Sequence, residues 1–217
     1  MSQNINLKEL ERKAWRSFYQ DGLWDIFLGL LLLAMAISAL LSDIGASEPV
    51  QLGIMIALEA LAILVLFVGK RRITVPRIGR VRFGPKRKRR LSKVRVVLAI
   101  SVLVGAALFV AGPVLTGKLS RSMTFEFILP AGWVVNCLVV FSLMAYFLDF
   151  SRLYLIGVLY ALAVPLDIMQ RELSSIDLTF VAFGFPAAVI LLMGAVVFTR
   201  FLRKYPLSAG EAPGVNC

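Results

Sequence analysis

Six long runs of apolar residues alternate with short polar segments along the chain. They cover about residues 22–41, 50–69, 94–115, 127–148, 153–169 and 178–199. Because a helix rises about 1.5 Å per residue, about 20 apolar residues are needed to cross a hydrocarbon core of roughly 30 Å. All six runs come close to this length, and the fifth is the shortest. The pattern predicts an all-α integral membrane protein with six transmembrane helices.

The residues before the first run have a different, amphipathic pattern. Apolar side chains recur there at helical spacing, with Lys and Arg on the opposite side; they are Leu7, Leu10, Ala14, Trp15 and Phe18. We predict a helix in this segment, residues 1–21, lying on the cytoplasmic membrane surface with its aromatic side chains at the headgroup boundary. Packing of the same side chains against the protein's own core is the alternative.

The distribution of basic residues gives the orientation. If the N-terminus is cytoplasmic, only Lys118, Arg121 and Arg171 of the 24 Lys and Arg residues lie on the opposite side, which leaves 21 inside. Such an excess is what the positive-inside rule describes. We therefore expect both termini in the cytoplasm and a location in the cell (inner) membrane. The sequence has no N-x-S/T acceptor and no prenylation box, which is typical of a prokaryotic protein.

These spans divide the chain into six segments. They are the interfacial helix at 1–21, the first pair of spans at 22–69, a basic cytoplasmic loop at 70–93, two further pairs of spans at 94–148 and 149–199, and a cytoplasmic tail at 200–217 that we expect to be disordered.

The basic loop has the alternation of a strand. Ile73 and Val75 precede a Pro-Arg-Ile-Gly stretch at 76–79, and Arg and apolar residues alternate from Arg80 to Phe83. This predicts a short β-hairpin on the membrane surface, followed directly by the basic run from Lys86 to Arg90.

Residues 70–95 contain thirteen Lys and Arg residues, more than orientation needs. Each basic residue near an anionic membrane surface contributes about 1 kcal/mol of attraction. We predict that the loop binds anionic lipid, ahead of an acidic protein partner, and we do not expect nucleic acid; the alternative is that the loop only fixes the orientation. The candidate residues are Arg77, Arg80, Arg82, Lys86, Arg87, Lys88, Arg89 and Arg90.

Two carboxylates lie at the cytoplasmic mouth of the first span. Asp21 and Asp25 are four residues apart, so they share one face of a helix. Together they could bind a cation. Alternatively, they pair with Arg side chains from the basic loop or favour the positive N-terminal end of the helix.

Three further polar residues are candidates for an intramembrane proton or ion site. Glu59 falls near the middle of the second span, where an ionised carboxylate costs at least ~2.5 kcal/mol. Asn136, in the middle of the fourth span, could instead form a structural hydrogen bond with it. Asp167 lies near the outer end of the fifth span, where we expect it at the interface.

The remaining composition excludes most enzyme classes. The chain has no His, and its two cysteines, Cys137 and Cys217, are far apart. It also lacks the HExxH, GxSxG and Gly-rich phosphate-binding motifs, so we predict no catalytic residue, metal or cofactor. The favoured function is a non-enzymatic scaffold or accessory subunit in a homo-oligomer or membrane complex. A small proton-coupled transporter or channel using Glu59 is the first alternative, and a lipid-modifying enzyme is the second.

Overall fold

The computed structural model describes residues 15, 18–78, 85–118, 123–173 and 179–206, with the backbone alone for 85–86, 108–118, 123–129 and 172–173. Within these ranges every regular element is a helix. The elements are α2 (Leu23–Asp43), α3 (Glu48–Gly69), a π-helical turn η1 (Lys70–Thr74), α4 (Val75–Ile78), α5 (Pro85–Lys118), α6 (Met123–Leu148), α7 (Arg152–Leu173) and α8 (Thr179–Lys204).

Five helices in the described part of the chain are long and apolar enough to cross a membrane. They comprise Leu23–Asp43, Glu48–Ile78, Pro130–Leu148, Arg152–Arg171 and Thr179–Lys204. These five helices coincide with five of the predicted spans and are compatible with a multi-pass membrane protein. Helix α5 coincides with the remaining apolar run. It is not among the helices apolar enough to cross a membrane, because its side chains are described only for residues 87–107, and six of these residues are basic.

The β-hairpin predicted for the basic loop is not confirmed. Residues 70–78, which include its first arm, continue from α3 as η1 and α4. Pro76 has no N–H and would clash with a carbonyl one turn back in a regular α-helix, and the wider π-helical turn before it accommodates the ring. The second arm, from Arg80 to Phe83, lies outside the described residues. The strand-like alternation was therefore too short to overcome helix continuation.

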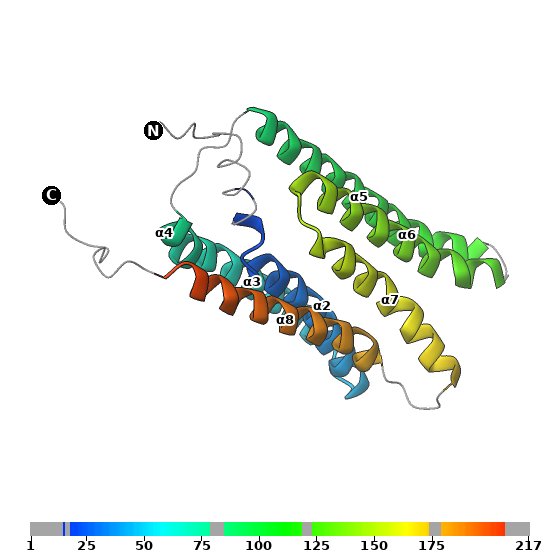
Figure 1. Cartoon of the computed structure of the whole chain (residues 1–217). Helices are drawn as coiled ribbons and strands as arrows, with labels where there is room; N and C mark the ends of the chain where they lie inside the picture. The colour runs from blue at the N-terminus through cyan, green and yellow to red at the C-terminus, as the bar shows by residue number, and fades with distance from the viewer. Residues whose placement is uncertain (1–14, 16–17, 79–84, 119–122, 174–178, 207–217) are drawn as a thin grey trace, which may run out of the picture.

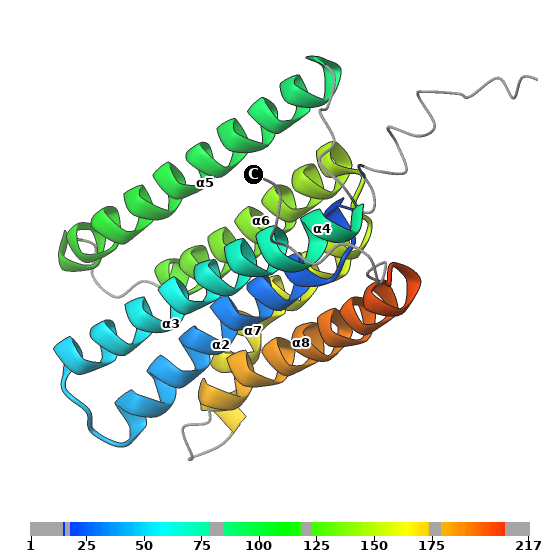
Figure 2. The same ribbon diagram turned by 90° about the vertical axis from the view of Figure 1, so that its left-hand side faces the viewer.

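The long helices pack mainly on their neighbours in the spatial order α3, α2, α8, α7, α6, α5. Figures 1 and 2 show α2 between α3 and α8, with α5 on the far side of α6. A hydrogen bond from the Tyr160 hydroxyl to the Leu28 carbonyl also joins α7 to α2. The buried side chains come chiefly from α2, α6, α7 and α8, whereas most of α3 is exposed.

Two glycines allow a close contact between α2 and α8. Gly22 has a φ of 90°, a conformation that other residues rarely adopt, and precedes the first turn of α2. A Cβ there would lie 2.6 Å from the Gly194 carbonyl oxygen and 2.7 Å from the Phe198 nitrogen. A Cβ on Gly194 would in turn lie 2.9 Å from the Ile26 nitrogen. The start of α2 is thus held against the end of α8, which places Asp21 and Asp25 inside the bundle.

Candidate functional site

Asp21 and Asp25, the paired acids of the sequence, are fully buried in the structure. Asp21 accepts hydrogen bonds on one oxygen from the Lys70 ammonium at 2.7 Å and the Thr74 hydroxyl at 2.6 Å. The other oxygen accepts the Leu23 N–H at 3.2 Å. Both oxygens therefore have partners within the chain, which argues against an open cation site at Asp21.

Lys70 is held by more than its ion pair with Asp21. Its ammonium also donates to the Phe18 carbonyl and lies 4.4 Å from the centre of the Phe18 ring. Lys70 and Thr74 are four residues apart at the two ends of η1, so this turn presents both donors to the same carboxylate. The N-terminal segment and the end of α3 are joined at this point.

Asp25 has a different environment. The Arg152 guanidinium at the start of α7 lies 3.2 Å from one Asp25 oxygen, which is ion-pair distance. The two groups are not oriented for a hydrogen bond. Neither Asp25 oxygen has a hydrogen-bond donor in the part of the chain that the structure describes. Together with Asp21 and Lys70, this pair forms a charge cluster of two acids and two bases. The two acids thus pair with basic side chains, but the partners are Lys70 and Arg152 of α7, and not Arg side chains from the basic loop as weighed from the sequence.

Asp149 forms a second ionic contact at the same end of the bundle, and sequence reasoning missed it. It lies in the turn between α6 and α7 with a φ of 54°. Its carboxylate accepts hydrogen bonds from Arg87 at 2.8 Å and Arg90 at 3.2 Å, and its carbonyl accepts one from the Gln20 side chain at 3.0 Å. The only signal in the sequence is a lone acid directly after an apolar span, opposite a basic loop.

The N-terminal segment packs against the protein where it is described. Most of the predicted amphipathic helix lies outside the described residues, but Trp15 is fully buried and Tyr19 nearly so. The Trp15 indole donates to the Leu148 carbonyl at 2.8 Å, and the Arg87 guanidinium lies 4.9 Å from its ring centre. Burial raises the pKa of Tyr19 to about 12, although the nearby charge of Arg95 opposes this shift. For these aromatic residues the structure favours core packing over the headgroup boundary.

The three intramembrane candidates are not brought together. Asn136 exchanges hydrogen bonds with Ser101 on α5 at 3.2 Å, not with Glu59. Glu59 is half-buried on α3, and the described residues provide it with no hydrogen bond or ion pair. Asp167 lies 3.3 Å from the exposed Arg171 one turn further along α7. The structure therefore provides no shared polar site for them.

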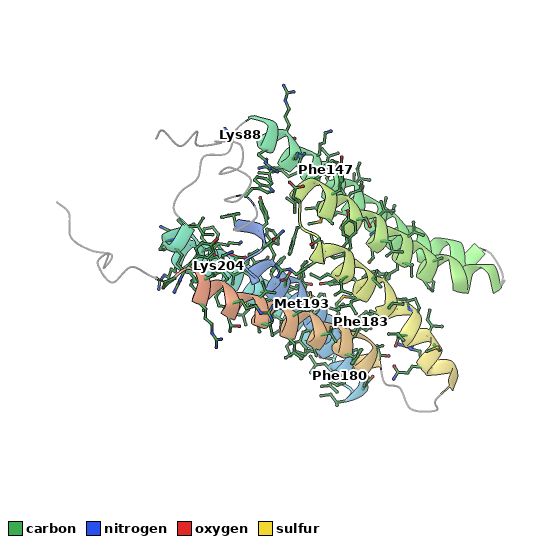
Figure 3. The ribbon with its side chains drawn as sticks, in the orientation of Figure 1. Lys88, Phe147, Phe180, Phe183, Met193 and Lys204 are labelled. Atoms are coloured by element: carbon green, nitrogen blue, oxygen red, sulfur yellow. The ribbon has the colours of Figure 1, made fainter. Side chains whose placement is uncertain are left out.

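The basic candidates of the loop divide into three groups. Arg87 and Arg90 bind Asp149, and Arg77 donates to the Ile73 carbonyl at 3.1 Å. Lys88 and Arg89 are exposed on the first turns of α5, and Lys88 lies at the same end of the bundle as Lys204 (Figure 3). The side chains of Arg80, Arg82 and Lys86 lie outside the described residues.

The chain matches no protein-family model, no curated protein and no solved structure. Among the described residues, no group of three or more acids and thiols is placed to hold a metal ion. The most distinctive feature of the described residues is the arrangement of charges at one end of the bundle. This arrangement, hereafter the basic end, comprises the start of α2, η1 with α4, the start of α5, the turn between α6 and α7, and the end of α8.

Proposed function

We propose that this protein is a non-enzymatic scaffold or accessory subunit of the cell membrane, and that its basic end binds anionic lipid on the cytoplasmic side. In this proposal α5 also crosses the membrane, as the third span along the chain, and brings the total to six. With six spans and a cytoplasmic basic end, both termini lie in the cytoplasm in this proposal, in accord with the positive-inside rule.

The observation that carries the proposal is an excess of exposed positive charge at the basic end. The acids described there, Asp21, Asp25 and Asp149, already contact basic partners inside the protein. Exposed basic side chains with no acidic partner in the described ranges remain at Arg71, Arg72, Lys88, Arg89, Lys93, Arg95, Arg200, Arg203 and Lys204. Anionic headgroups are the nearest source of compensating charge for a protein in a membrane.

The positions of the intramembrane polar residues support a scaffold over a proton-coupled carrier. A relay needs neighbouring groups that pass a proton, whereas Glu59, Asn136 and Asp167 lie on three helices with separate environments. The outer face of α3, with exposed Ile56 and Phe67, is instead available to a second copy or another subunit. Helices in a membrane associate in part through van der Waals packing, which such a face permits.

The test measures lipid enrichment around the reconstituted protein. Energy transfer from Trp15 and Trp24, which lie near the basic end, to fluorescent phosphatidylglycerol is compared with transfer to phosphatidylcholine carrying the same label. The variant Arg71→Gln/Arg72→Gln/Lys88→Gln removes three exposed charges, worth up to about 3 kcal/mol in total. We expect preference for phosphatidylglycerol in the wild type and a clearly weaker preference in the variant.

Arg171→Gln is the matched control because it removes an exposed positive charge from the opposite end of the bundle. It should leave the preference unchanged. Equal transfer to both lipids in the wild type, or an equal loss in the control, would refute lipid binding by the basic end. High salt should weaken the wild-type preference, because surface charges are screened.

A further inference from the structure

An apolar groove runs along the contact between α5 and α6, starting at the basic end. Its first part has a volume of about 480 Å³, and its mouth is lined by Arg89, Ser92 and Lys93. Phe147, at the end of α6, lies at the same mouth, with the Lys93 ammonium 5.7 Å from its ring centre. Figure 3 shows Phe147 close to the first turns of α5. The groove thus begins with two cations and a hydroxyl and continues along apolar side chains.

A second hollow of about 440 Å³ extends the groove deeper along the same two helices. Val97 and Leu143 line both hollows, so the two are continuous. The walls of the deeper part are almost entirely apolar, and its polar side chains, Ser101 and Asn136, hydrogen-bond to each other. A ligand for this part therefore needs no polar groups.

The length of the groove matches one leaflet of a bilayer. Eleven residues separate Lys93 at the mouth from Val104 in the deeper part, which is roughly 16 Å at about 1.5 Å per residue. Half of a hydrocarbon core of roughly 30 Å is about 15 Å. A molecule with an anionic head and one leaflet-long hydrocarbon chain fits these dimensions.

The cations at the mouth are available for such a head. Arg87 and Arg90, on the same turns of α5, bind Asp149. Arg89 and Lys93 are exposed and have no acidic partner among the residues that the structure describes. Because they are four residues apart, they lie on one face of the helix with Ser92 beside them. Arg, Lys and a hydroxyl are donors that a phosphodiester accepts.

We propose that this groove binds one anionic phospholipid, with its phosphate at Arg89, Ser92 and Lys93 and an acyl chain along α5 to Val104. The proposal rests on the proposed function in one respect, since that function places the basic end at the headgroup level. It goes further by assigning one bound lipid to one site, in addition to a general enrichment of lipid around the protein.

Native mass spectrometry of protein released from phosphatidylglycerol-containing membranes into mild detergent tests this site. We expect one retained anionic lipid per chain in the wild type. The retained fraction should fall at least tenfold in Arg89→Gln/Lys93→Gln, which removes the cations, and in Val139→Phe, which fills the groove. Matched controls are Arg95→Gln and Val102→Phe, exposed positions on α5 that do not line the groove. These controls should retain the lipid.

Retention unaffected by Val139→Phe, or equal retention of phosphatidylcholine, would overturn the proposal. Displacement by inorganic phosphate alone would also overturn it, because the acyl chain would then contribute nothing. Failure here can be told from failure of the proposed function. If phosphatidylglycerol is enriched around the reconstituted protein but none is retained in detergent, lipid binding in the groove is refuted and lipid binding by the basic end is supported. Retention without enrichment would support the groove and refute the general enrichment at the basic end.

Discussion

The buried ion pair between Lys70 and Asp21 gives the most quantitative prediction for the bundle. Substituting Lys70 by Met leaves the Asp21 carboxylate fully buried with only the Thr74 hydroxyl and the Leu23 N–H as donors. Breaking a buried pair by removing one partner costs about 3–5 kcal/mol, because the remaining charge is uncompensated. At about 2–4 °C per kcal/mol for a chain of this size, the transition temperature should fall by roughly 6–20 °C.

Cys137 supplies a native reporter for this measurement. Its thiol is buried, so a thiol-reactive fluorescent dye labels it only on unfolding, once Cys217 has been replaced by Ser. Arg71→Met is the matched control, since Arg71 is the exposed neighbour of Lys70 and should shift the transition little. Asp21→Asn combined with Lys70→Met should recover most of the loss because no buried charge remains unpaired. An equal shift for Lys70→Met and Arg71→Met would refute the reasoning.

Three further predictions concern the N-terminal part of the bundle. Gly22→Ala should destabilise the folded protein strongly, because the residue has a positive φ and a Cβ there would clash with α8. Gly53→Ala, at a position with open space around it, should be tolerated, and labelling of Cys137 by the dye compares the two variants. Trp15→Phe should cost about 0.5–1.5 kcal/mol, read as a lower transition temperature, because the Leu148 carbonyl loses its hydrogen bond. The Tyr19 phenol keeps its proton to about pH 12 in the folded protein, against about pH 10 in the unfolded chain. The part of the folding stability that depends on the protonated phenol is therefore complete below pH 10 and is lost as the pH rises towards 12. Tyr19→Phe should reduce this loss of folding stability at high pH, which tryptophan fluorescence follows. An unchanged dependence of stability on pH above about 10 would count against burial of the phenol.

The spans could be predicted from composition because a membrane core selects long apolar runs irrespective of tertiary detail. The approximate start of the first span could also be predicted, but the shared helical face of Asp21 and Asp25 was wrong, because α2 begins at Leu23 and Asp21 lies before its left-handed N-cap, Gly22. Their partners could not be predicted, since Lys70 and Arg152 meet them only after three separate helices have packed. Sequence spacing carries no information about such contacts.

The errors can each be traced to particular residues. The alternation between Ile73 and Phe83 looked like strand periodicity, but α3 continues through a π-helical turn into α4. Asp149 was overlooked because a single acid in a turn has no periodicity, and its partners Arg87 and Arg90 lie far away in the sequence, on α5. Trp15 was predicted to face headgroups, and its burial reflects packing against α6 that no local pattern encodes.

The measurement that tests the central claim most directly is proton flux into proteoliposomes under an imposed potential, for the wild type and Glu59→Gln. If the basic end rather than an intramembrane carboxyl carries the function, neither protein should conduct protons above the level of empty vesicles. Flux in the wild type that disappears in Glu59→Gln would contradict the scaffold and make Glu59 the centre of a transporter.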